Sequence, residues 1–207
     1  MAFNAYAPWI SRRQDGIVAS VPQVGDAAGH VGFDNTEATF SRFYRDGELL
    51  GDYEGNTTGA FDLPDAESTY RVEQTMSGEG YAGLSTEMTA AFTFRSARPA
   101  TDDEVALPVF AVRYQPSLDA SGSVRGRTVD LPLWVQSQAG EKIPVRTLGA
   151  EVSFDDGRSW RTLRIRPDGV ARVTYPKGRG FASLRLNAAD DRGSAVTQKV
   201  LRAYRFG

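Results

Sequence analysis

Most of the chain consists of short segments in which apolar and polar residues alternate, separated by turns rich in glycine, proline and aspartate. Residues 69–75 and 86–94 show this alternation, and Asp46-Gly47 interrupts a similar pattern in 39–50. Alternation at period two is typical of strands with one buried face, and Asp-Gly between two such runs indicates a hairpin. No segment has the periodicity of a long amphipathic helix. We therefore predict an all-β fold.

The second half of the chain repeats this pattern. Its predicted strands span 109–114, 128–135, 150–154, 160–166, 170–175, 181–188 and 195–206. About seven strands in roughly 100 residues is typical of an immunoglobulin-like or fibronectin-III-like sandwich. The chain is therefore predicted to contain two antiparallel β-sandwich modules of this kind in tandem.

A boundary between the modules is predicted near residue 104. The segment 96–104 is polar and contains a proline, as a short linker or a long connection between sheets would. Residues 1–104 hold 17 acidic and 7 basic side chains, a charge of −10, whereas residues 105–207 hold 9 and 17, a charge of +8. We expect an acidic module, 1–104, to contact a basic module, 105–207.

Several classes of site are excluded by composition. The chain has no cysteine, which rules out disulfides, thiolate zinc sites and a cysteine nucleophile. Its one histidine, His30, lies in a turn-like segment and has no Gly-x-Ser-x-Gly motif beside it, so we predict no catalytic triad and no role for His30. No apolar run is long enough to span a membrane, and residues 1–10 lack the features of a signal peptide, so any export signal is expected elsewhere.

Paired aspartates occur at 102–103, 155–156 and 190–191, all in predicted turns, where aspartate accepts hydrogen bonds from nearby backbone amides. No cofactor is predicted, with calcium at Asp190 and Asp191 as the alternative use of one pair. Residues 153–160 resemble the Asp-box, a hairpin motif of sialidase-type propellers, in which Asp155 would cap the turn and Trp160 would pack beneath it. A propeller repeats its motif in each blade, and this one occurs once.

Arginines are dense after residue 157, and a candidate ligand or interface surface is formed by Arg161, Arg164, Arg166, Arg172, Trp134 and Tyr175. Arg164 and Arg166 are expected to share one face of a strand. Three uses remain open: docking on the acidic module, binding of an anionic polymer such as a cell-wall polymer, and solubility. Nucleic acid is disfavoured, because the aromatic residues fall mostly at predicted core positions.

Three stretches of the second half resemble the C-terminal end of large secreted subtilisin-like serine proteases of actinomycetes. They are Glu151-Val-Ser-Phe-Asp-Asp-Gly-Arg-Ser-Trp160, residues 180–194 with Ser183-Leu-Arg-Leu-Asn-Ala-Ala-Asp-Asp191, and Val200-Leu-Arg-Ala-Tyr-Arg-Phe206. Residues 43–49, 70–73 and 92–96 resemble the preceding sandwich module of the same proteins.

The resemblance implies a secreted, non-catalytic accessory tandem that serves stability, substrate presentation or attachment, with an upstream protease catalytic domain as its partner in cis. The family's catalytic motifs are absent, so no catalytic residue is carried over. The alternative function is an extracellular module that binds an anionic or carbohydrate polymer.

Overall fold

The computed structural model describes residues 9–21, 24–25, 31–32, 38–55, 57–78 and 83–207. These residues form strands, turns and loops without any helix, so the all-β prediction is confirmed. The first half contains β1 (Trp9–Arg12), β2 (Gly16–Ser20), β3 (Val24–Gly25), β4 (Val31–Gly32), β5 (Ala38–Arg45), β6 (Glu48–Glu54), β7 (Thr57–Phe61), β8 (Ser68–Ser77) and β9 (Glu87–Ser96).

The second half contains β10 (Val105–Ala106), β11 (Phe110–Tyr114), β12 (Ser123–Val124), β13 (Thr128–Ser137), β14 (Thr147–Ser153), β15 (Arg161–Thr162), β16 (Val170–Thr174), β17 (Gly180–Ala189) and β18 (Ala195–Phe206). The predicted strand at 195–206 is reproduced in full by β18. The hairpin predicted at Asp46-Gly47 joins β5 to β6, with φ of 50° and 87° at the two turn residues, as a type I′ turn requires.

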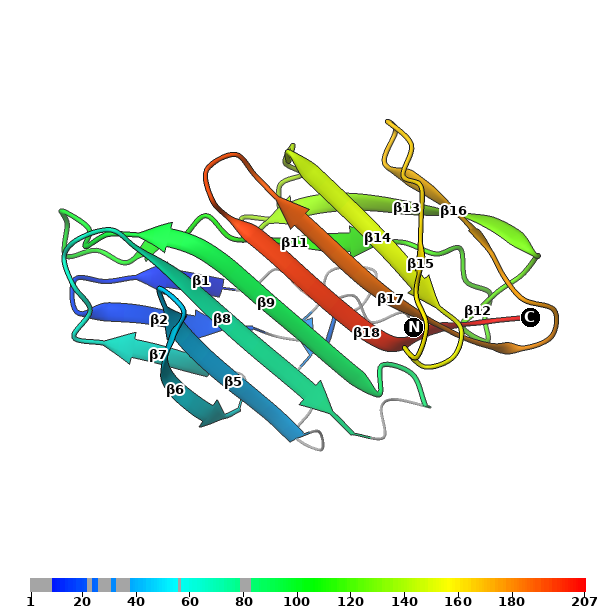
Figure 1. Ribbon diagram of the computed structural model, residues 1–207, viewed down its shortest axis with the longest axis horizontal. Coiled ribbons are helices and arrows are strands. Elements are labelled where there is room, and N and C mark those ends of the chain that lie inside the picture. Colours follow the sequence, from blue (N-terminus) through cyan, green and yellow to red (C-terminus); the bar gives the residue numbers. More distant parts are fainter. Residues whose placement is uncertain (1–8, 22–23, 26–30, 33–37, 56, 79–82) are drawn as a thin grey trace.

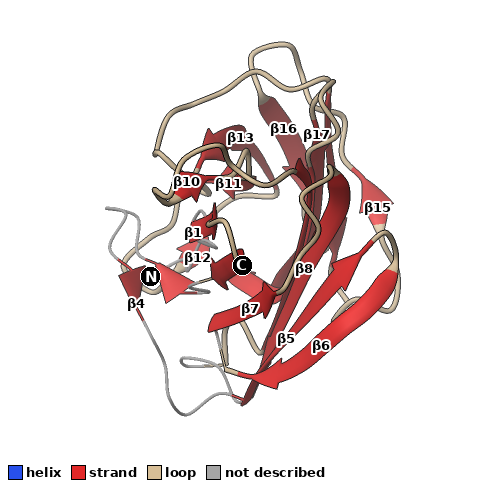
Figure 2. Ribbon diagram, turned by 90° about the vertical axis from the view of Figure 1, so that its left-hand side faces the viewer, coloured by secondary structure: helices blue, strands red, loops and turns tan. Residues whose placement is uncertain are grey.

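One large sheet runs through both halves of the chain, in the order β15-β14-β17-β18-β9-β8-β5-β6, with β12 attached to β18 (Figure 1). A four-stranded sheet, β10-β1-β2-β7, and a three-stranded sheet, β11-β13-β16, lie on the same side of it (Figure 2). The strands β3 and β4 pair with each other. The fold therefore consists of two β-sandwiches placed side by side, which confirms the sandwich prediction.

The two sandwiches share the large sheet through the pairing of β9 with β18. This antiparallel ladder, here called the seam, runs from Thr93↔Ala195 to Glu87↔Leu201. Residues 97–104 cross from β9 in the large sheet to β10, which pairs with β1 in the four-stranded sheet. The segment is therefore a connection between sheets and not a short linker between modules.

The strand predicted at 160–166 is much shorter in the structure. Only Arg161 and Thr162 pair with β14, and the chain then leaves the large sheet for the three-stranded sheet, where β16 pairs with β13. A single bridge, Ile165↔Ala171, lies on the way. One strand cannot pair in both layers, so the alternating sequence is divided between them.

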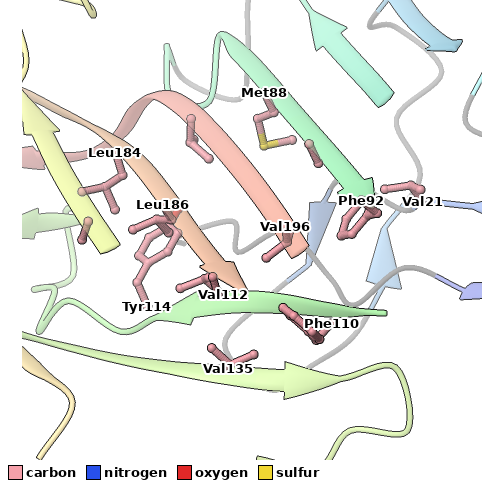
Figure 3. Close-up of a cluster of buried hydrophobic side chains, with 14 of the residues drawn as sticks. Val21, Met88, Phe92, Phe110, Val112, Tyr114, Val135, Leu184, Leu186 and Val196 are labelled. Carbon is pink, nitrogen blue, oxygen red and sulfur yellow. The ribbon is translucent and has the colours of Figure 1, made fainter. Parts of the chain in front are cut away.

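Apolar side chains from both halves form one buried cluster between the sheets. Figure 3 shows Phe92 of β9 beside Val196 of β18, with Met88 farther along β9 and Val112 of β11 across the layer. Burial of such side chains stabilises a fold by about 25 cal/mol for each Å² of apolar surface removed from water. The seam is therefore backed by core packing as well as by backbone hydrogen bonds.

Gln198 of β18 joins the two layers behind the seam. Its side chain is 3% exposed, and its Oε1 accepts a hydrogen bond of 2.7 Å from the backbone N–H of Val112. We expect Gln198→Leu to lower the free energy of unfolding by about 1–3 kcal/mol, because the buried Val112 amide loses its acceptor. Urea unfolding measures the change. Thr197→Leu, at the exposed neighbouring position, is the matched control, and equal losses in both variants would contradict the role given to Gln198.

Glu104 holds the connection between the sheets against β1. Its carboxylate accepts hydrogen bonds from Ser11 Oγ at 2.6 Å, Trp9 Nε1 at 3.3 Å and Arg13 Nη2 at 2.7 Å. The hydrogen bonds from Ser11, Arg13 and Trp9 lower the pKa of Glu104 from 4.5 to about 2. The ionised side chain therefore fastens the connection across the pH range in which most proteins are folded.

A pH-dependent loss is expected for Glu104→Gln. A carboxylate whose pKa is lowered by folding stabilises the folded state above its unfolded pKa, and this contribution disappears as the pH falls through the folded value. The variant should melt below the parent protein above pH 4.5, and the difference should vanish near pH 2. Calorimetry across this range measures it, with Glu141→Gln as control at an exposed position. A difference that persists unchanged at low pH would contradict this explanation.

Candidate functional site

The six residues of the predicted surface are spread over separate parts of the second sandwich. Trp134 lies on β13, Arg161 on β15 and Arg172 on β16, while Arg164, Arg166 and Tyr175 lie outside the strands. Arg164 and Arg166 do not share a strand face, because β15 ends at Thr162. The predicted stripe is thus not a continuous feature of one strand.

Two of its arginines are paired with carboxylates of the same sandwich. Asp130 on β13 receives Arg166 Nη2 and Arg172 Nε, each at 3.3 Å, and Arg166 also contacts Asp168. Hydrogen bonding from Arg172 lowers the pKa of Asp130, so this carboxylate stays ionised. These contacts hold Arg166 and Arg172 within the second sandwich and reduce the positive charge available to a partner.

Tyr175 belongs to the core, so its assignment to an exposed surface is wrong. The residue is 3% exposed, and its hydroxyl lies 3.1 Å from that of Tyr204. Its ring stacks on Phe206 and meets Phe154 edge to face. The pattern at 170–175 indicated correctly that alternate residues are buried, and Tyr175 falls on the buried side with Val173.

The remaining aromatic candidate, Trp134, and the candidate Arg161 both take part in cation–π contacts. The Lys142 ammonium lies 5.0 Å from the centre of the Trp134 ring, and the Arg161 guanidinium lies 5.8 Å from the centre of the Phe154 ring. Such cation–π contacts are worth about 0.5–1 kcal/mol at exposed sites. A sugar ring stacking on the face of Trp134 that Lys142 covers would have to displace the lysine.

The Asp-box segment forms the hairpin between β14 and β15. Asp155 Oδ1 accepts hydrogen bonds from Ser153 Oγ at 2.7 Å and from the Ser159 backbone N–H at 2.9 Å, which confirms that it caps the turn. Hydrogen bonds from Ser159 and Ser153 lower its pKa. Trp160 donates from Nε1 to the Gly157 carbonyl, and the Arg185 guanidinium lies 4.3 Å from the centre of its ring. The motif therefore stabilises a hairpin that is largely exposed and in which Trp160 is half-buried.

The other acidic pairs also lie in turns. Asp190 Oδ1 accepts hydrogen bonds from the backbone N–H groups of Arg192 and Ser194, as expected of a turn aspartate. Within the part of the chain that the structure describes, no group of three or more histidine or acidic side chains is placed to hold a metal ion. The lack of a cofactor stays a prediction, with calcium at Asp190 and Asp191 as its alternative, and His30 lies outside the described residues.

A different group of arginines lines a cleft at the end of the second sandwich, here called the arginine cleft. Its volume is about 480 Å³, and its walls come from β12 with the turn before it, the start of β17 and the end of β18. Figure 1 shows where these three strands lie in the fold. Arg125, Arg179 and Arg205 belong to its lining, as do Asp119 and Phe181. The parallel pairing of β12 with β18, Ser123↔Arg205 and Val124↔Phe206, brings these segments together.

The sequence did not identify this group, because its arginines lie far apart along the chain and the pairing of β12 with β18 has no local signal. The turn itself was visible as the glycine- and serine-rich segment 121–126. In the structure, Asp119 Oδ1 accepts hydrogen bonds from the backbone N–H groups of Ser121 and Ser123. The sequence signal that could have located this site is an aspartate at the start of such a turn, because Asp119 also accepts a hydrogen bond from Arg125 at the end of the turn.

Comparisons with known proteins add little. No protein-family model matches the chain, and no curated protein matches it. Among solved structures, the chain is similar to extracellular domains 3–5 of Drosophila OTK, with 9% sequence identity, 97% of each chain covered and a TM-score of 0.22. Similarity at this level supports no conclusion about function. Within the described residues, the structure has no helix suited to crossing a membrane.

Proposed function

We propose that the chain is a non-catalytic accessory tandem of a larger exported protein, with a subtilisin-like serine protease as its parent. The resemblance of the terminal segments motivates the parent, and the single histidine motivates the lack of catalysis. The seam is the observation that most favours a mechanical role. It supports the idea that the tandem is a rigid platform for stability, substrate presentation or attachment, rather than a hinge.

Several contacts cross the boundary between the two halves of the chain. Flexible domain boundaries have few contacts and tend to lie in exposed linkers. Here the β9–β18 ladder, the Gln198 bridge to Val112 and the ion pair of Lys199 with Glu87 all cross it or lie beside it. Bending the tandem at this point would break strand pairing and expose core residues, so the two sandwiches would be held in a defined relative orientation.

Small-angle scattering at varied ionic strength tests this rigidity. Exposed charges attract each other over about 30 Å at 0.01 M salt but only about 3 Å at 1 M. Because the seam consists of backbone pairing and apolar packing, we expect the scattering profile of the purified chain to be the same at both salt concentrations. A marked increase in the radius of gyration at high salt would show that opposite charge alone holds the halves together, and the rigid-platform proposal would be dropped.

The lack of catalysis is tested with the same preparation. The purified chain is expected to hydrolyse no peptide bond in casein or in a library of fluorogenic peptides. Hydrolysis that co-purifies with the chain and disappears in a single-residue variant would overturn the proposal. The coding sequence on the amino-terminal side of the chain tests the parent, since a subtilisin-like domain with its Asp, His and Ser motifs is expected there, and another catalytic domain would replace it.

A second candidate function, binding of an anionic or carbohydrate polymer, is favoured by the charge of +8 on residues 105–207. Binding driven by charge weakens as salt screens it. The chain should therefore sediment with purified cell wall at low ionic strength and be released at high ionic strength. If it sediments with neither wall nor isolated polysaccharide at low salt, this candidate is excluded. Both functions place the chain outside the cell.

A further inference from the structure

The arginine cleft is lined by three arginines and by one carboxylate whose oxygens already accept hydrogen bonds. Arg125, Arg179 and Arg205 come from three different segments, and Asp119 is the one acidic side chain among the residues that line the cleft. Asp119 Oδ2 accepts a hydrogen bond of 2.7 Å from Arg125 Nε, while its Oδ1 accepts from Ser121 and Ser123. The carboxylate is therefore fully engaged within its own turn, and the lining side chains carry a net charge of +2.

Arg179 has the guanidinium that is most available to a ligand. It lies in an exposed position just before β17, and its side chain makes no hydrogen bond or ion pair with any other residue that the structure describes. Arg125 is also accessible, since 81% of its side chain is exposed despite its bond to Asp119. Such an exposed ion pair contributes little to stability and can rearrange around a stronger acceptor.

Phe181 forms the apolar part of the cleft, but cations lie on its ring. The Arg202 guanidinium is 4.8 Å from the ring centre and the Arg205 guanidinium is 5.6 Å from it. Arg202 is held there by two hydrogen bonds to Asp156, at 2.9 Å and 2.8 Å. A sugar ring would therefore not gain a free aromatic face at this position, and recognition in the cleft would depend on charge.

The chemistry of the lining selects among anions. A guanidinium donates two parallel N–H groups and matches carboxylate and phosphate in geometry. A carboxylate has two oxygens, whereas a phosphate monoester has three terminal oxygens that can accept from several guanidinium groups at once. A phosphodiester also has two free oxygens per phosphate, but they are arranged around a tetrahedral phosphorus and can each face a different guanidinium. A volume of about 480 Å³ lies within the usual range of sites for small ligands. We propose that the arginine cleft binds phosphate, either in a small phosphorylated ligand or in one repeat of a phosphodiester polymer.

This inference deepens the polymer-binding candidate, while the accessory role does not depend on it. The scattering and peptidase experiments do not involve the cleft, so a failure here would leave the accessory role standing. Wall sedimentation without phosphate binding would place the polymer on another surface and overturn the inference alone.

The test is a calorimetric titration of the purified chain at low ionic strength with glycerol 1-phosphate and, in a second arm, with poly(glycerol phosphate). Arg179→Gln is the cleft variant. Arg164→Gln is its matched control, since Arg164 is an exposed arginine of the same half that lies outside the cleft. Removing one charged hydrogen-bonding partner should weaken binding roughly tenfold or more in Arg179→Gln, with the control within about twofold of the parent. Equal melting temperatures would establish that both variants are folded.

The two arms distinguish the source of the phosphate. Saturable binding of glycerol 1-phosphate that Arg179→Gln weakens supports a site for a small ligand. Binding of the polymer alone, weakened in the same selective way, supports a polymer site. The proposal is overturned if neither probe binds, if Arg179→Gln binds as the parent does, or if both variants lose affinity equally, because the attraction would then be unspecific.

Discussion

Replacing Phe92 by alanine is expected to destabilise both halves of the protein together, by about 3–5 kcal/mol. Phe92 lies on β9 in the first half, is 1% exposed, and stands opposite Val196 of β18 in the seam. Truncation removes apolar contacts and leaves a cavity that the surrounding sheets can close only in part. Because one core cluster contains residues of both sandwiches, the loss of stability should affect the second sandwich as well as the first.

Tryptophan fluorescence can separate the halves. Trp9 lies in the first half, whereas Trp134 and Trp160 lie in the second. In a Trp9→Phe background the signal comes from the second half alone, and Phe92→Ala should shift its urea midpoint as far as it shifts the circular dichroism of the whole chain. A transition of the second half that stays unchanged would show that the two sandwiches unfold independently.

The control for this experiment is Phe61→Ala on β7, where the residue is 61% exposed. Substitutions at exposed positions away from special features usually change stability by less than about 0.5 kcal/mol. Comparable losses from Phe61→Ala and Phe92→Ala would contradict the importance given to the core behind the seam.

Alkaline pH is expected to unfold the protein steeply, because two fully buried tyrosines must lose a proton. Burial raises the pKa of Tyr114 and raises that of Tyr204 well above 10.0, the latter with further contributions from Tyr175. A group whose pKa is raised by folding stabilises the folded state below its unfolded pKa, and this contribution is lost as the pH rises toward the folded value. Each tyrosine should therefore lower the free energy of unfolding by about 1.4 kcal/mol per pH unit above about pH 10.

Denaturant midpoints measured from about pH 8 to about pH 12 test this expectation. The double variant Tyr114→Phe, Tyr204→Phe should lose less stability per pH unit than the parent, although it starts lower at neutral pH because Tyr175 loses its hydrogen-bonding partner. Tyr53→Phe, on the exposed edge strand β6, is the control and should follow the parent. Equal slopes in the parent and the double variant would show that other groups cause the alkaline transition.

Local features of the chain were predictable where the chemistry that determines them is itself local. The turn at Asp46-Gly47 needs two residues that tolerate positive φ, and the sequence supplies them at the required spacing. The capping of the 153–160 hairpin by Asp155 was predicted from its resemblance to the Asp-box, and the hydrogen bonds that form the cap are local as well. Residues 160–166 show the limit of this reasoning, because an alternating pattern cannot indicate that the chain changes sheets partway through.

Features that depend on distant segments were not predictable in this way. The candidate surface was assembled from residues close in sequence, yet Tyr175 is buried, and Arg166 and Arg172 are paired with Asp130. The arginine cleft, by contrast, gathers residues from three segments that share no sequence pattern. Its formation requires β12 to lie beside the end of β18, and only the packing of the whole second sandwich imposes that arrangement.

By itself, the sequence determined the all-β class, the approximate strands and turns, and the opposite charge of the two halves. Alternation, turn chemistry and charge act over a few residues and can be recognised without a fold. Only the tertiary structure decided that the sandwiches join through β9 and β18 into one sheet, and which arginines meet in a cleft. Long-range packing decides which strand edges pair and which guanidinium groups lie together. Pairing between distant strands cannot be recognised from the sequence of either strand alone.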